Sequence, residues 1–509
     1  MKTRFGLFLV ALSASLLSIA QTHITVDNPV TWSGEVLRPY IGQTVVFDVP
    51  MLVSANANGN YIVSPWRRFQ PETHGSVGTA DYKETVRINN SCMFSIDNIS
   101  GYHRCGEKII GLQAKVNSTN SLTWGKGTWS GNTRADLTAG LPDLGDYRLL
   151  VCGFNLENYY LTWGSMGARN ATEHERQRKK IRAALVRINA DIFGLVELQQ
   201  GDDAIEEIMQ DLNARLPERN YKHFKDAASG TLQKVDFLYD ANKVEPVSNT
   251  PAETTVEFAH RKKMMCFREK ATGEKFIYSI NHFKSMSGDS ESRRVNEAKA
   301  VIDLYKAYAN SKVVRDKDIL IMGDLNCYAF TAPIKQMTEK GMIDLHRAFH
   351  ADTSYSYMFG GYTSYIDHAL SNATMYPQIT GMAGYHINSD EDDRYTYDKS
   401  TGDTTMFRCS DHDPVLVGLK LDSTLTYDPS PSVNSYDIIE DNLHALTIRN
   451  AYSEDSPSYY AIYNLRGDLI ERQTVTSSFH LVQLPEDAGL YIIYIYAEGE
   501  VYQRKFLVP

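Results

Sequence analysis

The chain has 509 residues, of which 42% are hydrophobic, and it carries a formal net charge of -10 at neutral pH. Because this length exceeds that of one ordinary domain, we expect about two to four domains, each with its own core, and the hydrophobic content excludes a disordered polymer. The negative charge argues against a broad basic surface for holding nucleic acid, although an enzyme needs positive potential only at its cleft.

Residues 1–20 have the pattern of a secretory signal peptide. Lys2 and Arg4 precede an apolar stretch, and the small residues Ser18 and Ala20 stand where cleavage is expected. A membrane anchor is the alternative, but serines interrupt the run, which is shorter than the ~20 apolar residues of a membrane span. No later segment is apolar enough to cross a bilayer.

Residues 21–140 are rich in Gly, Asn, Ser and Thr and contain short alternating runs such as "TVVFDV" and "YIVSPW". Alternation with a period of two is typical of strands that have one buried face. We therefore expect a small β-barrel or β-sandwich in this part of the chain.

Residues 146–421 alternate between strand-like and helix-like segments, which indicates a layered α/β domain. The spacing of Ile181, Leu185 and Ile188 predicts one buried helix face. The apolar run from Ile192 to Val196 then predicts a buried strand.

The stretch 422–435, "DSTLTYDPSPSVNS", has the composition of a linker. Beyond it, residues 436–509 are expected to form a compact all-β domain, with two strand-like runs on either side of Glu498, Gly499 and Glu500.

Six cysteines lie beyond the signal-like segment, and an even number in an exported protein permits disulfides. Their scatter excludes a CxxC zinc ribbon, and six are too few to build a disulfide scaffold of this size. The best local pair is Cys92 with Cys105. The full set is Cys92, Cys105, Cys152, Cys266, Cys327 and Cys409.

Polar residues recur where the apolar strands of the middle domain end, and a rigid sheet can present such residues to one cleft. Carboxylates gathered there repel one another unless a cation lies among them. Oxygen ligands favour Mg²⁺, with Mn²⁺ or Ca²⁺ as alternatives, over zinc. The residues are Asn155, Glu197, His282, Asp324, Asn326 and Asp367, with Asp411 and His412 just before the last strand.

A histidine in such a cluster adds a second capability. A neutral imidazole can accept a proton from water near neutral pH, especially when a carboxylate fixes its tautomer. A cation together with a histidine held by an aspartate predicts hydrolysis. A phosphodiester would be the anion that the cation and the basic loop "HRKKM", residues 260–264, can neutralise.

The motifs "FNLEN", "GLVELQ", "INHFKS", "MGDLNCYAF", "YIDHAL" and "CSDHDPV" occur in this order. Over residues 146–421 the chain resembles the endonuclease/exonuclease/phosphatase superfamily of metal-dependent phosphoesterases. More narrowly, "SYSYMFGGYTSYIDHALSN" and "HINSDE" resemble segments of secreted bacterial nucleases that degrade extracellular DNA. The resemblance implies a four-layer αββα sandwich.

The resemblance also implies roles for the residues around the cation and the water. Glu197 would be the main metal carboxylate, with Asn155 and Asp411 as further ligands, directly or through water. His412 would be the general base that activates the attacking water, and Asp367 would orient it.

On the substrate side, the resemblance gives Asp324 and Asn326 the task of positioning the nucleophile and the scissile phosphate. His282 would donate a hydrogen bond to a phosphoryl oxygen, and Arg261 would stabilise the same oxygen by its charge. The metal would stabilise the departing 3′ oxygen, so that products carry 5′-phosphates.

Several of these assignments have alternatives. Glu157 is an alternative ligand in place of Asn155, and Lys284 is either a phosphate contact or an exposed lysine. "HRKKM" departs from the expected Arg-Pro pattern, so a solvated Arg261 stays open. Asp413, before a proline, could simply form a turn.

Cys327 follows Asn326, and Cys409 lies two residues before Asp411. Because both cysteines flank the predicted site at neighbouring strand ends, a Cys327–Cys409 disulfide that braces the cleft is one hypothesis. Buried thiols, which pack as small apolar groups, are the alternative.

The first domain resembles the OB-like β-barrels attached to some secreted nucleases. Trp66, Arg67, Arg68 and Phe69 would suit stacking and phosphate contact with single-stranded nucleic acid. In the alternative interpretation, the two aromatic residues belong to the core and the arginines are solvated.

The tail resembles the C-terminal sorting domain of type IX secretion through "YNLRGDLIERQ", "DAGLYIIYI" and the terminal "RKFLVP". This resemblance implies export through the periplasm by the type IX machinery, with the protein released or attached to the cell surface. An ordinary carbohydrate-binding or spacer sandwich is the alternative.

The sequence therefore predicts a secreted, monomeric nuclease that acts on DNA, with RNA as a second substrate class. A secreted phosphoesterase of lipids or inositol phosphates shares the fold and the metal–histidine machinery and is the main alternative. A surface adhesin with an inactive nuclease domain is a further alternative, which the complete set of site residues argues against.

Overall fold

The structure is a computed structural model. The described residues are 22–24, 34–57, 60–164, 166–226, 232–254, 261–288, 290–350, 352–422, 424, 437–441, 445–449, 458–464, 468–475, 479–482, 484–485, 487, 489–497 and 500–508. The predicted signal peptide and nearly all of the predicted linker lie outside these residues. Among the helices that the structure describes, none has the length and apolar character needed to cross a membrane.

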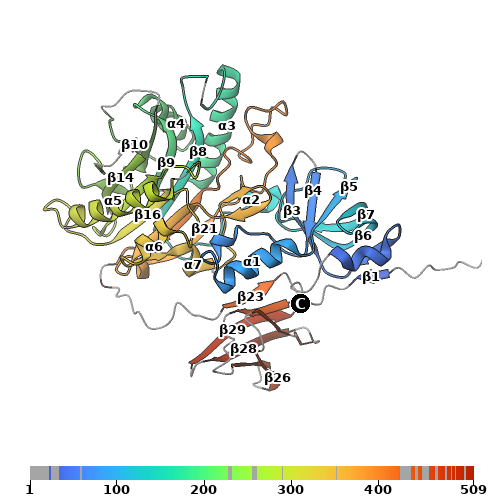
Figure 1. Cartoon of the computed structure of the whole chain (residues 1–509). Coiled ribbons are helices and arrows are strands. Elements are labelled where there is room, and N and C mark those ends of the chain that lie inside the picture. Colours follow the sequence, from blue (N-terminus) through green and yellow to red (C-terminus); the bar gives the residue numbers. More distant parts are fainter. Residues whose placement is uncertain are drawn as a thin grey trace, which may run out of the picture.

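The N-terminal part is built mainly from strands, shown in blue and cyan in Figure 1. Its sheet has the strand order β1-β2-β6-β3-β4-β5-β7, and β6 also pairs with β7, so the order returns on itself. The OB-like assignment stays a prediction. The elements are β1 (Thr22–Ile24), η1 (Gly34–Tyr40), β2 (Thr44–Phe47), β3 (Met51–Ala57), β4 (Asn60–Ser64), η2 (Pro71–Thr73), α1 (Ala80–Asn90), β5 (Phe94–Asp97), β6 (Lys108–Ser118), β7 (Ser121–Ser130) and α2 (Arg134–Ala139).

The middle part contains two large sheets. One has the order β10-β11-β9-β8-β22-β21, and the other has the order β12-β14-β15-β16-β20-β17, with β13 beside β14. The elements of the first half are β8 (Leu149–Tyr159), α3 (Ala171–Ile188), β9 (Ile192–Gln199), α4 (Asp203–Arg215), β10 (Tyr221–His223), β11 (Gln233–Asp240), β12 (Val244–Pro246), β13 (Ala252–Glu253), β14 (Lys262–Glu269) and β15 (Lys275–His282). Those of the second half are α5 (Glu291–Ala309), β16 (Ile319–Asp324), α6 (Ala332–Thr338), β17 (Met342–Asp344), α7 (Leu345–His350), β18 (Tyr357–Phe359), β19 (Tyr362–Ser364), β20 (Asp367–Asn372), η4 (Tyr376–Gln378), β21 (Ile379–Gly384), η5 (Asp393–Tyr395) and β22 (Val415–Leu419).

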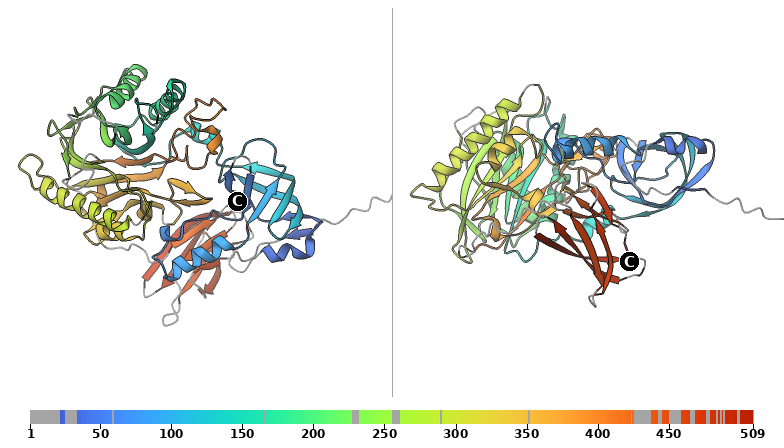
Figure 2. Two further views of the ribbon diagram at one scale, coloured as in Figure 1. Left: turned by 45° about the horizontal axis from the view of Figure 1, so that its top comes forward. Right: turned by 60° about the horizontal axis from the view of Figure 1, so that its bottom comes forward.

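Three buried clusters show how these elements are layered. Side chains of both large sheets share the central cluster, which includes Val196, Tyr278 and Met322. Helices α3 and α4 pack on the outer face of the first sheet, and α5 and α6 pack on the outer face of the second. The middle part is therefore a mixed α/β fold in which helices cover both faces of a pair of sheets, as Figures 1 and 2 show.

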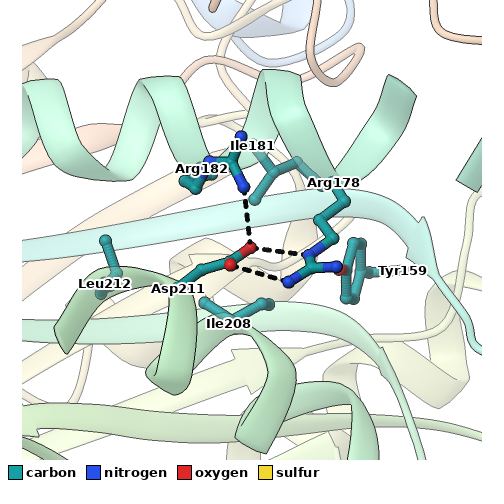
Figure 3. A pocket seen from close by; sticks show the side chains of 7 residues that line it. All are labelled: Tyr159, Arg178, Ile181, Arg182, Ile208, Asp211 and Leu212. Atoms are coloured by element: carbon teal, nitrogen blue, oxygen red, sulfur yellow. Dashed lines mark hydrogen bonds and ion pairs between the residues drawn. The ribbon is translucent and has the colours of Figure 1, made fainter. Parts of the chain in front are cut away.

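The predicted helix face and strand are confirmed. Ile181, Leu185 and Ile188 of α3 are buried against the first sheet, and β9 begins at Ile192. Between α3 and α4, Asp211 accepts two hydrogen bonds of 2.8 Å from Arg178, and Figure 3 shows this pair among apolar side chains of both helices.

The C-terminal part contains two sheets, with the strand orders β23-β24-β27 and β26-β25-β28-β29. Side chains of both sheets share one buried cluster. Its strands are β23 (Asp437–Asp441), β24 (Ala445–Arg449), β25 (Tyr459–Asn464), β26 (Leu469–Thr474), β27 (Phe479–Val482), β28 (Gly489–Ala497) and β29 (Glu500–Val508). The two strand-like runs of the tail correspond to β28 and β29, and the sorting-domain assignment stays a prediction.

Both predicted disulfides are wrong, because the six cysteines are free and buried. Cys327 lies in the core beside α5 and α6, whereas Cys409 lies in the core beside α3 and α4, so the paired sheets separate the two thiols. Cys92 and Cys105 share the N-terminal core but are not bonded.

The segment Trp66–Phe69 joins the N-terminal part to the middle part. Arg67 forms an ion pair with Asp390, and Arg68 lies over the ring of Tyr362. Phe69 forms an isolated β-bridge with Thr363. The prediction that this segment binds nucleic acid is therefore corrected, since its arginines already have protein partners. The alternative of solvated arginines is wrong for the same reason, although Trp66 does pack against the N-terminal core.

Candidate active site

The two large sheets bring the predicted site residues to one edge. In the second sheet, His282 at the end of β15 is directly opposite Asp324 at the end of the parallel strand β16. Asp324 is in turn opposite Asp367, which begins the antiparallel strand β20. The sequence predicted Asp367 at the end of a strand, whereas in the structure it begins one. Because β20 is antiparallel to β16, its start still lies at the same edge of the sheet as the ends of β15 and β16.

The first sheet contributes Asn155, Glu197 and His412 to the same edge. Glu197 is in β9 with φ of 65°, a left-handed backbone conformation that is rare for residues other than glycine. The β8–β9 pairing shifts register just after Asn155. Irregular strand positions of this kind turn a side chain toward a site, and they persist because the surrounding structure holds them.

His412 and Asp367 form a buried pair that joins the two sheets. Asp367 Oδ2 lies 2.8 Å from His412 Nδ1, and Ser356 donates a second hydrogen bond of 2.8 Å to that oxygen. The other ring nitrogen, Nε2, lies 3.9 Å from Asp324 Oδ2 and 3.8 Å from Asp411 Oδ1. Asp367 thus holds one side of the imidazole, and the other side faces two carboxylates.

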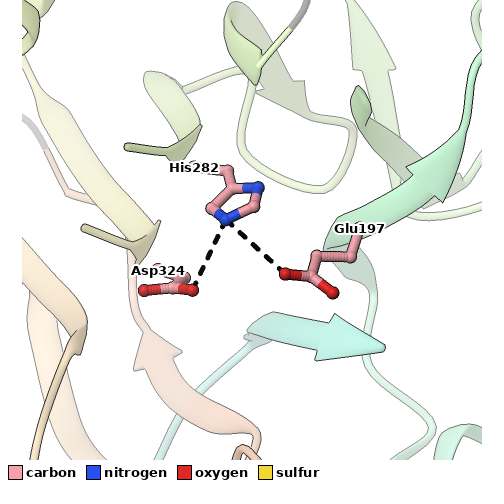
Figure 4. Close-up of side chains that lie close together, drawn as sticks. All are labelled: Glu197, His282 and Asp324. Atoms are coloured by element: carbon pink, nitrogen blue, oxygen red, sulfur yellow. Dashed lines mark ion pairs between the residues drawn. The ribbon is translucent and has the colours of Figure 1, made fainter. Parts of the chain in front are cut away.

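Glu197, His282 and Asp324 form the second cluster of the site, shown in Figure 4. His282 Nε2 lies 3.6 Å from Glu197 Oε1 and 3.6 Å from Asp324 Oδ2. Asn158 also donates its backbone N–H to Glu197 over 2.9 Å. The histidine therefore lies between two acids that come from different sheets.

The electrostatics of the site show an excess of negative charge. Burial, together with the charges of Asp367 and Glu197, raises the pKa of Asp324 to about 8. Burial and the charge of Asp411 raise the pKa of Glu197. Burial opposes protonation of His412, but the carboxylates of Asp367, Asp411 and Asp324 outweigh it and raise its pKa well above the usual value.

His282 differs from His412 in this respect. Burial, followed by the positive charges of Arg261, His412, Lys262 and Lys284, lowers the pKa of His282 well below its usual value. Its Nδ1 atom is buried and has no hydrogen-bond partner among the described residues. These effects favour the neutral form of His282, in which one ring nitrogen carries an N–H group that can be donated.

Two asparagines hold Asp324 in place. Asn155 and Asn326 each donate a side-chain N–H to Asp324 Oδ2 over 3.1 Å, and the backbone N–H of Asn326 donates to Oδ1 over 2.9 Å. The amide oxygen of Asn155 accepts the backbone N–H of Glu157 over 3.0 Å. The predicted role of Asn155 as a ligand stays a prediction.

Arg261, Lys284 and Glu157 lie around these clusters. Arg261 is half-buried and close enough to Glu197 and Asp324 for their charges to act on it, although burial lowers its pKa. Lys284 Nζ donates to two serine hydroxyl groups, at 2.7 and 3.2 Å. Burial and the charge of Asp411 raise the pKa of Glu157 to about 8, and its Oε2 atom has no partner among the described residues.

Sequence reasoning missed the residues that support the His412–Asp367 pair. Ser356 holds Asp367, and the ring of Tyr357 lies 4.8 Å from that of His412. The segment "SYSYMFGGYTSYIDHALSN", which carries the nuclease resemblance, was the available signal, because it contains Ser356, Tyr357 and Asp367. Asp413, considered as a turn residue, is fully buried and accepts the backbone N–H groups of Asn388 and Ser389.

The donor set fits a divalent cation. Ligand atoms of Glu197, His282 and Asp324 lie within 4.8 Å of one another, and so do those of Asp324, Asp367 and His412. Burial and the charges of neighbouring carboxylates raise the pKa values of Glu197 and Asp324, and a bound cation would oppose both effects. Oxygen-rich donors of this type suit Mg²⁺ or Mn²⁺.

The sequence profile of the Endonuclease/Exonuclease/phosphatase family matches residues 153–412. The match covers just over half of the chain and contains every site residue named above, so the protein belongs to this family. The family consists of metal-dependent phosphoesterases and nucleases, which agrees with the buried acids and histidines of the site.

Solved structures resemble about half of the chain. A Bacteroides thetaiotaomicron protein of the family is 19% identical, with a TM-score of 0.38 over 54% of this chain and 98% of that chain. A mannosyl-6-phosphatase of that organism is 18% identical, with a TM-score of 0.38 over 54% and 100%. The catalytic domain of human nocturnin with bound sulfate is 13% identical, with a TM-score of 0.38 over 53% and 94%. No curated protein matches the sequence.

Proposed function

We propose that the protein is a metal-dependent phosphodiesterase that hydrolyses DNA. The observation that carries the proposal is the buried His412–Asp367 pair, whose free nitrogen Nε2 faces Asp324 and Asp411 at 3.9 and 3.8 Å. An imidazole held at Nδ1 by a carboxylate accepts a proton at Nε2. The carboxylates raise the pKa of this imidazole, and a cation bound among them would lower it again. The neutral ring would then take the proton of a water molecule beside the acidic cluster.

The other residues would bind and polarise the phosphate. His282 is neutral and would donate an N–H to a phosphoryl oxygen, while Arg261 and Lys284 supply positive charge on the same side of the site. Glu197 would hold the cation, with Asn155 and Asp411 as further ligands and Glu157 as an alternative to Asn155. A bound Mg²⁺ supplies Lewis-acid stabilisation of negative charge on phosphate oxygens.

Two features support DNA as the substrate. The segments "HINSDE" and "SYIDHALSN" resemble those of secreted nucleases, and the basic side of the site suits a phosphodiester anion. A phosphoesterase of lipids or inositol phosphates would use the same acids and histidines, so substrate choice needs a direct comparison.

Secretion is a further part of the proposal and is supported by the sequence of the two ends of the chain. The signal-like residues 1–20 would direct export to the periplasm, and the C-terminal domain would be the type IX sorting signal of a monomeric, secreted or surface-attached enzyme. Intact mass of the protein from the culture medium tests this. Retention of residues 1–20 would contradict it.

One assay series tests the activity. The purified protein is incubated with circular DNA, linear DNA, RNA and sphingomyelin, each with Mg²⁺ and with EDTA, beside His412→Ala. We expect DNA cleavage that EDTA abolishes and that the alanine variant lacks. Lipid cleavage without DNA cleavage would overturn the substrate, and equal activity of the variant would overturn the role of His412.

A further inference from the structure

A short buried segment of the middle part, residues 386–391, connects the N-terminal part to the active site. Asp390 and Glu391 in this segment have fully buried side chains, at 0% exposure. Buried carboxylates are stable only when cations and hydrogen-bond donors surround them. Here the cations come from the N-terminal part, more than 250 residues away in sequence.

Arg67 satisfies Asp390. Its guanidinium donates to both carboxylate oxygens, at 2.7 and 3.3 Å, and also lies 4.2 Å from the ring centre of Tyr355. Tyr355 donates its hydroxyl group to the same carboxylate over 2.8 Å. Asn132, also from the N-terminal part, adds a bond of 2.8 Å.

Glu391 is held by two further arginines. Arg104 Nε lies 2.6 Å from Oε1, and Arg134 Nη2 lies 2.6 Å from Oε2. Arg104 is itself 1% exposed and also donates to the backbone oxygen of His386. Three arginines of the N-terminal part therefore fix one segment of the middle part from outside.

The other side of this segment holds the residues around His412. Asn388 donates its side-chain N–H to the backbone oxygen of His412 over 2.6 Å. The backbone N–H groups of Asn388 and Ser389 donate to Asp413 over 2.8 and 2.9 Å. A shift of the segment would thus move the backbone on which the His412 ring is mounted.

A second connection leads to Asp367. Tyr355 is stacked between Arg67 and the ring of His386, whose centre is 3.7 Å away. The next residue, Ser356, donates to Asp367, and its backbone oxygen accepts the N–H of Asp413 over 2.8 Å. The segment that the arginines hold therefore supports His412, and Ser356, whose neighbour Tyr355 contacts Arg67 and Asp390, supports Asp367.

We propose that the N-terminal domain is a component of the active site, in which Arg67, Arg104 and Arg134 are positioning residues for the His412–Asp367 pair. The proposal rests on the proposed phosphodiesterase activity. It predicts that loss of one arginine slows the chemical step, although none of the three touches His412 or Asp367. If the N-terminal domain only bound substrate, loss of one of these arginines would change KM and leave kcat the same.

The test uses the full chain with bis(p-nitrophenyl) phosphate, a small diester that reports on the chemical step, and with amide hydrogen exchange measured by mass spectrometry. For Arg67→Gln, we expect kcat to fall between ~10-fold and ~100-fold, as for a displaced catalytic group, with KM within about 2-fold. Arg67→Lys keeps the positive charge, and its kcat should lie between that of Arg67→Gln and that of the wild type. Exchange in peptides covering 386–391 and 409–413 should become faster.

Arg38→Gln is the matched control, because Arg38 is an arginine of the same domain whose ion pair with Glu35 is exposed. It should leave kcat and exchange unchanged. If Arg67→Gln does not fold, Asp390→Asn carries the test, because an amide of the same shape can keep the bond from Tyr355. The same loss of kcat and the same faster exchange are expected.

If the wild type is active and folded Arg67→Gln has the same kcat, the proposal is overturned. A change of Arg67→Gln in KM alone would overturn it as well. An inactive wild type would contradict the proposed function instead. In that case the exchange measurement still decides, because unchanged exchange at 386–391 and 409–413 would overturn the structural connection and faster exchange would support it.

Discussion

The central prediction concerns how Asp367 acts. In the proposed mechanism it would act on the water through His412, since its Oδ2 lies 2.8 Å from His412 Nδ1 and accepts a hydrogen bond of 2.8 Å from Ser356. Asp367→Ala should therefore impair the same step as His412→Ala. Removing a general base commonly lowers kcat by ~10²–10⁴, which corresponds to about 3–5 kcal/mol of barrier at ~1.4 kcal/mol per tenfold.

The structure also bounds the effect on stability. Asp367 is 3% exposed and His412 is 6% exposed, so the pair is shielded from solvent. Breaking a buried pair costs about 3–5 kcal/mol when one charge is left alone. Here Asp324 and Asp411 remain near Nε2, at 3.9 and 3.8 Å, and we expect the lower end of that range. The variant should fold.

The double variant gives the decisive result. If Asp367 works only through His412, Asp367→Ala/His412→Ala should be no slower than His412→Ala alone, because residues that act as one unit are not additive. Initial rates on bis(p-nitrophenyl) phosphate measure this. Asp318→Ala is the matched control, an aspartate just before β16 and at the opposite end of that strand from Asp324. Losses that multiply in the double variant would refute the reasoning.

Three further predictions follow from the buried charges and thiols. The pKa of Asp324 is raised to about 8, so Mn²⁺ binding at pH 7 should release up to about one proton from this carboxyl group, and the release should vanish near pH 9. Calorimetry in two buffers of different ionisation enthalpy measures the number of protons released. No proton release at pH 7 would contradict the prediction. Burial would raise the pKa of Asp390, but Arg67 and Arg104 outweigh it and hold that pKa below its usual value. The carboxylate therefore stabilises the fold above about pH 4 and loses this effect as the pH falls further. Asp390→Asn should be destabilised by about 3–5 kcal/mol at pH 6 and by progressively less below pH 4 in urea unfolding, whereas a constant difference would contradict this assignment. Thiol titration of the unreduced, denatured protein should find six free thiols, and four would indicate a disulfide.

Local sequence patterns were sufficient for much of the middle part. The spacing of Ile181, Leu185 and Ile188 identified the buried face of α3, and the apolar run from Ile192 identified β9. Both patterns depend on neighbours within a few residues, which is why a sequence reveals them. Polar residues at the strand ends likewise predicted a shared edge, because a sheet aligns the ends of its strands.

Contacts between segments that are far apart in the sequence could not be predicted from local patterns. The cysteine pairing failed because sequence proximity to the site says nothing about which face of a sheet a side chain occupies, and Cys327 and Cys409 face opposite cores. Trp66–Phe69 combined aromatic and basic residues, a composition that suits nucleic acid and a domain interface equally well. The two interpretations are distinguished only by the positions of Asp390 and Tyr362, which contact Arg67 and Arg68 in the folded structure.

The acids, amides and histidines of the candidate site could be predicted from the sequence, because they follow or precede apolar strands whose ends meet at one edge of a sheet. Tertiary structure decided how that chemistry is supported. Asp390 and Glu391 lie in the middle part, and their arginine partners Arg67, Arg104 and Arg134 lie in another domain. Buried charge must find its partner in space rather than along the chain, so only the folded structure shows that the N-terminal domain supports the backbone of His412.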